Sequence, residues 1–118
     1  MGRNQNLGAL GEKLVANYLI ERKYKILVQN WRIREGEVDL IARKNNGAIV
    51  FVEVKTRTSK SYGDPFEAID NKKAYRLQKL ALTWLALNNL WGIDYQIDCA
   101  SVLIQGTNPV IEYRERAL

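Results

Sequence analysis

The segment from Gly36 to Lys55, GEVDLIARKNNGAIVFVEVK, constrains the fold more than any other part of the chain. Two strand-like runs, Glu37–Arg43 and Ala48–Lys55, flank an Asn-Asn-Gly sequence, which is typical of a tight β-hairpin connection. Ionisable side chains interrupt both runs, and burying a carboxylate is costly unless another group pairs with it. The segment therefore predicts an antiparallel hairpin that holds charged groups among core-facing residues.

The length of the turn decides whether the acidic residues of the two strands meet. A three-residue loop over 45–47 places Asp39 opposite Glu53, whereas a two-residue turn over 46–47 places Asp39 opposite Val54. We expect the longer loop, with its glycine in the left-handed conformation that such loops require. Like charges directly opposite each other are destabilising in a sheet, and a cation between the two carboxylates would remove that repulsion.

The alternation of strand side chains groups the charged residues further. It assigns Glu53 and Lys55 to one face and, in the preceding strand, Glu37 and Asp39 to one face opposite Val38. These three carboxylates and one amine all stand at odd-numbered positions of the two strands. Such a group more often binds a divalent metal than holds a fold together. The amine of Lys55 would then hold an attacking water or stabilise charge on a phosphate oxygen.

The residue types that are missing narrow the chemistry of such a site. The chain has no histidine and a single cysteine, which excludes Ser-His-Asp and Cys-His nucleophile systems and zinc sites built on histidine or thiolates. A metal must therefore bind to oxygen atoms, which points to Mg²⁺ or Mn²⁺. Asp39 and Glu53 are the expected ligands, Glu12 on the first helix is a candidate outer ligand, and Glu37 would either bind the metal or support a ligand.

The remaining segments alternate between helical and strand patterns. Helices are expected at Leu7–Ile20 and Asp70–Asn88, and strands at Lys25–Ile33, Gln96–Ile104 and Pro109–Tyr113 in addition to the hairpin. The order αβββαβ, with an antiparallel hairpin and a helix that crosses over to the next strand, predicts an α/β fold. We expect a mixed sheet flanked by helices.

Length and composition set the broad class. The 118 residues suffice for one core, and no repeat or linker divides them, so residues 1–118 are expected to form a single domain. No apolar run approaches the ~18 residues of a membrane span, so no membrane partner is expected. The N-terminal sequence lacks the apolar stretch of a secretory signal. The lone Cys99 excludes an internal disulfide and fits a reducing cytoplasm.

Basic residues supply candidates for contact with a polyanion. The net charge of +5 favours such partners. The candidate nucleic-acid-binding residues lie after the hairpin and at the start of the second long helix: Arg57, Lys60, Tyr62, Lys72 and Lys73. The loop residues would either grip a nucleic-acid backbone or serve solubility alone. Lys73 would either contact phosphate or balance the carboxylates, or extend its amine to solvent.

These motifs resemble a known superfamily. A helix Glu (Glu12), a strand Asp (Asp39) and Glu-x-Lys (Glu53, Lys55) look like the PD-(D/E)XK nucleases, which share the restriction endonuclease-like fold. The chain is identified more closely as a member of the YraN family, itself similar to archaeal Holliday-junction resolvases. The matching sequences are GALGEKLVANYL at Gly8–Leu19, GEVDLIAR at Gly36–Arg43 and FVEVKTR at Phe51–Arg57, followed by Gly63, Pro65, Glu67-Ala68 and Lys73.

The resemblance implies Mg²⁺-dependent hydrolysis of phosphodiester bonds. It implies Asp39 and Glu53 as metal ligands and Lys55 as the catalytic lysine, with nucleic acid, DNA in the first place, as the partner. Branched, Holliday-junction-like DNA is one candidate substrate, and a two-fold homodimer would suit symmetric cleavage of two strands. Val38 stands where the superfamily name has Pro, a common substitution in the superfamily.

Three hypotheses for function stay open at the level of sequence. The first is an endonuclease, for which metal-dependent cleavage is the test. The second is a nucleic-acid-binding module without catalysis, which salt-dependent binding without hydrolysis would indicate. The third is a protein-interaction subunit with a residual acidic cluster, which would bind neither divalent metal nor DNA.

Overall fold

The fold is an α/β arrangement around one sheet. The computed structural model describes residues 3–59, 63–64, 66 and 69–118. Along the chain the elements are α1 (Arg3–Glu21), β1 (Lys25–Ile33), β2 (Gly36–Arg43), β3 (Ile49–Arg57), α2 (Asn71–Leu87), β4 (Tyr95–Leu103) and β5 (Val110–Arg114). The strand and helix order expected from the sequence is confirmed, and the expected boundaries differ from these by only a few residues at each end.

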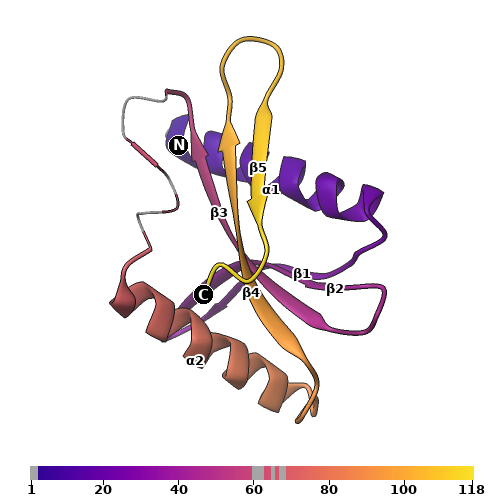
Figure 1. The fold of residues 1–118 in the computed structure, drawn as a ribbon. Helices are drawn as coiled ribbons and strands as arrows, with labels where there is room; N and C mark the ends of the chain where they lie inside the picture. Colours follow the sequence, from indigo (N-terminus) through magenta and orange to yellow (C-terminus); the bar gives the residue numbers. More distant parts are fainter. Residues whose placement is uncertain (1–2, 60–62, 65, 67–68) are drawn as a thin grey trace.

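The sheet is mixed and follows the chain order β1-β2-β3-β4-β5. The pairs β1–β2, β2–β3 and β4–β5 are antiparallel, whereas β3 and β4 are parallel and are joined through α2. A parallel pair needs a crossover connection of this kind. In Figure 1 the strands β3, β4 and β5 run side by side through the centre, and α1 and α2 lie apart from each other on the two sides of the sheet.

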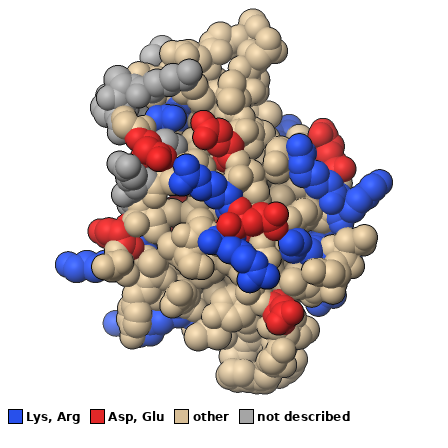
Figure 2. Space-filling view, in the orientation of Figure 1, with Lys and Arg blue, Asp and Glu red and all other residues tan. Residues whose placement is uncertain are grey.

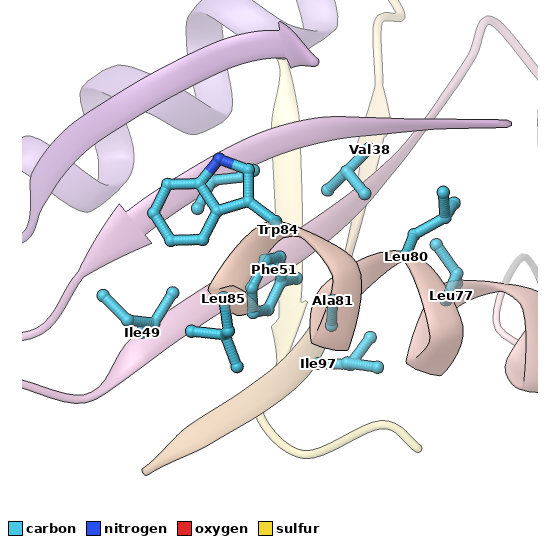
Figure 3. Close-up of a cluster of buried hydrophobic side chains, with 10 residues drawn as sticks. Val38, Ile49, Phe51, Leu77, Leu80, Ala81, Trp84, Leu85 and Ile97 are labelled. Carbon is cyan, nitrogen blue, oxygen red and sulfur yellow. The ribbon is translucent and has the colours of Figure 1, made fainter. Parts of the chain in front are cut away.

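Each helix covers its own face of the sheet with its own core. On the α2 side, Trp84 packs edge-on against Phe51, with ring centroids 5.8 Å apart, and Figure 3 shows the apolar side chains of α2 pointing at those of the strands. On the α1 side, Val15 and Leu19 pack against Val50 and other small apolar strand residues. Strands covered on both faces read as nearly continuous apolar runs, which explains the sequence IVFV at the start of β3.

Local signals fix the turn of the hairpin and the start of α2. Gly47 has φ 93° and the Asn46 side chain accepts a hydrogen bond from the Ala48 N–H, so the three-residue loop is confirmed. At α2 the Asp70 carboxylate accepts from the N–H of Lys73 at 2.8 Å and caps the helix. An N-cap acid satisfies a backbone donor that the helix itself cannot.

The expected alternation of β2 side chains between the two faces of the sheet is wrong at Val38. Val38 packs on the α2 side together with Ile41, whereas Leu40 packs on the α1 side. In the neighbouring strand Asn30, between the paired residues Gln29 and Trp31, has φ 54°, a left-handed conformation that strand residues rarely adopt.

None of the helices in the described part of the chain combines the length and apolar content needed to cross a membrane.

The close approach of α1 to β3 gives a test of the fold. A Cβ added at Gly11 would come within 2.9 Å of the Thr56 Cβ and closer still to its hydroxyl, whereas a Cβ at Gly8 on the same helix would meet nothing within 4 Å. We expect Gly11→Ala to lower the free energy of unfolding by about 1–3 kcal/mol through overpacking. Gly8→Ala should leave it unchanged or raise it by up to about 1 kcal/mol. Urea denaturation measures both, and equal stability of the two variants would contradict this packing.

Candidate functional site

Asp39 and Glu53 follow directly after the last paired residues of the β2–β3 ladder. The paired residues run from Arg43–Ile49 to Leu40–Val52, and the ladder ends there, one step before the Asp39–Glu53 pair that the sequence predicted. Here the Oδ2 atom of Asp39 accepts a hydrogen bond from the Val54 N–H at 2.7 Å. The side chain thus takes the place of a strand carbonyl, which fixes the carboxylate beside the backbone of β3.

Asp39 lies in an environment that disfavours its charge. Burial, followed by the negative charge of Glu53, raises its pKa to about 7, against the lowering effect of the Val54 N–H. Glu12 and Glu37 raise it further by smaller amounts. Desolvation and like charges both favour the protonated form of a carboxyl group. A cation bound here would relieve both effects.

Glu53 already has a cationic partner from α2. The Nζ atom of Lys73 lies 2.9 Å from its Oε1, and the two side chains are 27% and 16% exposed. Lys73 therefore balances a carboxylate, which was one of the alternatives that the sequence left open for it. Within the described residues the ion pair of Glu53 is made by Oε1, so its second carboxylate oxygen, Oε2, is available as a metal ligand.

Lys55 completes the group on β3. Its side chain is exposed and borders the same small pocket as Glu53, Lys73 and the buried Cys99. No ion pair holds its amine among the residues that the structure describes. A positive group that is exposed and uncommitted beside the pocket of Glu53 is available to a phosphate oxygen or a water molecule.

The two remaining candidate acids border this centre from other elements. Glu12 comes from α1 and has a raised pKa, first because of burial, while a hydrogen bond from the Asn30 side chain lowers it and the charges of Glu37 and Glu53 raise it. Glu37 is half exposed and forms an ion pair with Arg32 at 2.8 Å.

The donor set fits a hard divalent cation held by few protein ligands. In the described part of the chain no three Asp, Glu, Cys or His side chains gather closely enough to hold a metal ion by themselves. Mg²⁺ usually keeps several waters and is bound through one or two carboxylates together with substrate phosphates. Asp39 and Glu53 satisfy that requirement, whereas Glu37 is engaged by Arg32. The roles of Glu12 and Glu37 as ligands stay predictions.

The basic residues predicted for nucleic-acid contact are placed differently from one another. Arg57 at the end of β3 donates to the Gly63 carbonyl at 2.8 Å, and Lys72 is exposed at the start of α2. Lys60 and Tyr62 lie outside the described residues. Acidic and basic side chains are interspersed on the face seen in Figure 2, which shows no broad surface of one sign there.

A cleft beside the site is lined by two arginines that the sequence analysis did not single out. The cleft, about 480 Å³ in volume, lies between the β1–β2 turn and the first half of α2, and Glu53, Arg32 and Arg76 all line it. Helical spacing offered one signal, because Arg76 lies three residues after Lys73 and so shares its side of α2. Nothing in the sequence pattern of β1 marked Arg32.

A second buried acid belongs to the framework and not to this site. Asp98 on β4 is fully buried and accepts hydrogen bonds from the Gln96 side chain and the Arg116 N–H, each at 2.9 Å, and from the Tyr113 hydroxyl. Buried charges are tolerated when they are bonded in this way. The bonds tie the C-terminal segment to the sheet, which gives Asp98 a structural role.

Comparison with known families gives one match that covers most of the chain. The model of a family described as "Uncharacterised protein family UPF0102" matches residues 11–102. A UPF0102 protein from Trichlorobacter lovleyi is 44% identical over 111 residues, which is 93% of this chain and 87% of that protein. One from Alkaliphilus metalliredigens is 40% identical over 114 residues, which is 97% of this chain and 98% of that protein. UPF0102 is the YraN family, so the family predicted from the sequence is confirmed.

Comparison with solved structures gives more distant likenesses. One, titled "Structure of EndoMS-dsDNA2 complex", has a TM-score of 0.43 and 20% identity, and covers 74% of this chain and 34% of that chain. Another, titled "crystal structure of a repair endonuclease from Pyrococcus abyssi", has a TM-score of 0.41 and 18% identity. It covers 79% of this chain and 38% of that chain. This chain spans little more than a third of either, and what the titles say of DNA and repair describes those proteins.

The raised pKa of Asp39 predicts how stability depends on pH. The pKa of Asp39 is about 7 in the folded chain, against an ordinary value of 3.8 that the unfolded chain would have. Between these two pH values the folded state therefore binds one proton more than the unfolded state. The free energy of unfolding should therefore fall as the pH rises from 4 to 8, by an amount on the order of 2–4 kcal/mol after allowance for partial exposure. Asp39→Asn, which keeps an acceptor for the Val54 N–H, should remove this fall.

Urea denaturation from pH 4 to pH 8 in EDTA measures the effect. Asp39→Asn should be more stable than the wild type at pH 8 and no more stable at pH 4. Asp94→Asn, which changes an exposed carboxylate in the α2–β4 loop, is the matched control and should follow the wild type throughout. If the free energies of unfolding of wild type and Asp39→Asn changed with pH in parallel, the pKa of Asp39 would not be raised in the folded state, which would contradict the prediction.

Proposed function

The chain belongs to the UPF0102 family, and on that premise we propose that it is a divalent-metal-dependent endonuclease acting on DNA. The observation that carries the proposal is the closeness of two carboxylates at the end of the β2–β3 pair, where the charge of Glu53 raises the pKa of Asp39. The uncommitted amine of Lys55 borders the same pocket as Glu53. Phosphodiester hydrolysis needs oxygen donors for a cation and a positive group where charge develops on phosphate. The resemblance of the sequence to PD-(D/E)XK nucleases supports the same assignment.

The proposed reaction is the hydrolysis of one phosphodiester bond. A water oxygen attacks phosphorus, the bond from phosphorus to the leaving oxygen breaks, and a phosphate monoester and a free hydroxyl result. Bound Mg²⁺ or Mn²⁺ would polarise the phosphoryl group and lower the pKa of a bound water. Asp39 and Glu53 would hold the cation. The Nζ atom of Lys55 would orient the attacking water or contact the phosphate oxygen that gains charge.

Two contacts prepare the carboxylates for this role. The Val54 N–H holds the Asp39 carboxylate in one orientation, and Lys73 holds that of Glu53. Ligands fixed before the cation arrives lose little freedom when it binds, which favours binding. A carboxylate must also be ionised to bind a metal, so cation binding would release the proton that Asp39 retains near neutral pH.

A non-catalytic nucleic-acid-binding module is the second candidate. The observation that favours it is the ion pair between Glu53 and Lys73, which neutralises one of the two proposed ligands without any metal. In that case the basic side chains would bind the phosphate backbone, and affinity would fall steeply with salt. Hydrolysis under divalent metal separates the two candidates.

Cleavage assays test the proposed catalytic residues one at a time. Labelled duplex, flap and junction DNA are incubated with protein in Mg²⁺ or Mn²⁺, and with EDTA as the blank. Asp39→Asn, Glu53→Gln and Lys55→Gln should each lower the cleavage rate by about 100-fold or more, the loss that follows removal of one charge-stabilising group. Asp94→Asn is the matched control and should cleave at the wild-type rate.

The outcomes of the assay are distinct. Metal-dependent cleavage that survives Asp39→Asn unchanged would assign the activity to another site or another protein. Salt-dependent DNA binding without cleavage in either metal would favour the non-catalytic module. A preference for junction DNA over flap and duplex would support branched DNA as the substrate.

Calorimetry tests the proposed metal ligands without any nucleic acid. At pH 8, where Asp39 is ionised, the wild type should bind Mn²⁺, and Asp39→Asn should lose most of this binding because a neutral amide replaces a carboxylate ligand. At pH 6 the wild-type affinity should be lower, because the raised pKa of Asp39 makes a proton compete with the ion. Equal Mn²⁺ binding by wild type and Asp39→Asn would contradict the assignment.

A further inference from the structure

The cleft next to Glu53 is lined by both charged and apolar side chains. Its cations are Arg32 from β1 and Lys73 and Arg76 from α2, and its carboxylates are those of Glu37 and Glu53. Leu77 and Leu80 of the α2-side core also line it. Figure 3 shows these two leucines next to each other on α2. A nucleotide, whose sugar carries a phosphate and a flat base, offers a group for each kind of side chain.

Among the cations of this cleft, Arg76 is the one without a partner. Arg32 is paired with Glu37 and Lys73 with Glu53, whereas the guanidinium of Arg76 takes part in no ion pair or hydrogen bond among the described residues. Arg76 is exposed, and its aliphatic stem lies along Gly36, with Cδ 3.5 Å from the position a Cβ would take there. The β1–β2 turn therefore directs this side chain along the edge of the cleft.

The cleft is large enough for an organic ligand. A volume of about 480 Å³ exceeds what a water or an ion needs, and pockets of about 300–1,000 Å³ hold organic ligands of nucleotide size. The bases of a continuous duplex are stacked inside the helix and cannot enter such a cleft unless a nucleotide leaves the stack. Once unpaired, a base can pack on apolar side chains and on the plane of an arginine.

We propose that this cleft binds one unpaired nucleotide next to the scissile phosphate, with Arg76 as the residue that contacts it. The inference rests on the proposed function, because Glu53 belongs both to the cleft and to the proposed metal site. The substrate class is then DNA with an unpaired nucleotide at the cleavage position, such as a single strand, a flap or a bulge. Continuous duplex DNA leaves the cleft empty.

The test measures binding without metal, so that it does not depend on catalysis. Fluorescence anisotropy in EDTA compares three labelled DNAs: a continuous duplex, the same duplex with one extra unpaired nucleotide, and the single strand. The wild type should bind the bulged duplex and the single strand about tenfold more tightly than the continuous duplex, the gain expected from packing one base. Arg76→Gln should remove this preference.

Lys79→Gln is the matched control because it removes one positive charge from α2 at an exposed position over the Tyr75 ring, which does not line the cleft. It should lower all three affinities by a common factor and leave the preference intact. Equal binding of all three DNAs by the wild type would overturn the inference, as would an intact preference in Arg76→Gln or its loss in Lys79→Gln.

The same DNAs separate failure of the inference from failure of the proposed function. Metal-dependent cleavage of the continuous duplex at the rate of the bulged duplex would overturn the inference and leave the nuclease proposal standing. Arg76-dependent preference for the bulged duplex in EDTA, with no cleavage of any DNA in Mg²⁺ or Mn²⁺, would support the cleft assignment and overturn the nuclease proposal.

Discussion

The contact between the Asp39 carboxylate and the Val54 N–H organises the site. It fixes an acid against β3 at the point where the β2–β3 ladder ends. Burial of this carboxylate and, next to it, the negative charge of Glu53 raise the pKa of Asp39 to about 7. A fold gains nothing from such an arrangement alone. The strain is accounted for if a cation completes the site, which is the physical basis of the proposed function.

The neighbouring elements hold the other charges in balance. Lys73, in the first turn of α2, pairs with Glu53, although a cation at a helix start opposes the helix dipole. Arg32 pairs with Glu37, and Asn30 bonds to Glu12. Each of these acids has one partner from a different element. Lys55 and Arg76 take part in no ion pair within the described residues, and each lines a pocket that Glu53 also lines.

The sequence predicted those parts of the fold that local chemistry decides. The Asn-Asn-Gly loop set the hairpin register, because a one-residue slip would have moved every strand side chain to the other face. The Asp70 cap and the apolar stripe of α2 predicted the long helix. The reversal at Val38 could not be predicted, because strict alternation along a strand assigns Val38 and Leu40 to the same face, whereas they pack on opposite faces. The cleft was missed because it forms between β1, β2 and α2, which are distant in sequence.

Anomalous diffraction from a crystal soaked in Mn²⁺ at pH 8 tests the central claim most directly. The proposed site predicts a peak between the carboxylates of Asp39 and Glu53, on the side of the sheet that carries Lys55. A crystal with both carboxylates ordered, the pair between Lys73 and Glu53 intact and no peak at this position would contradict it.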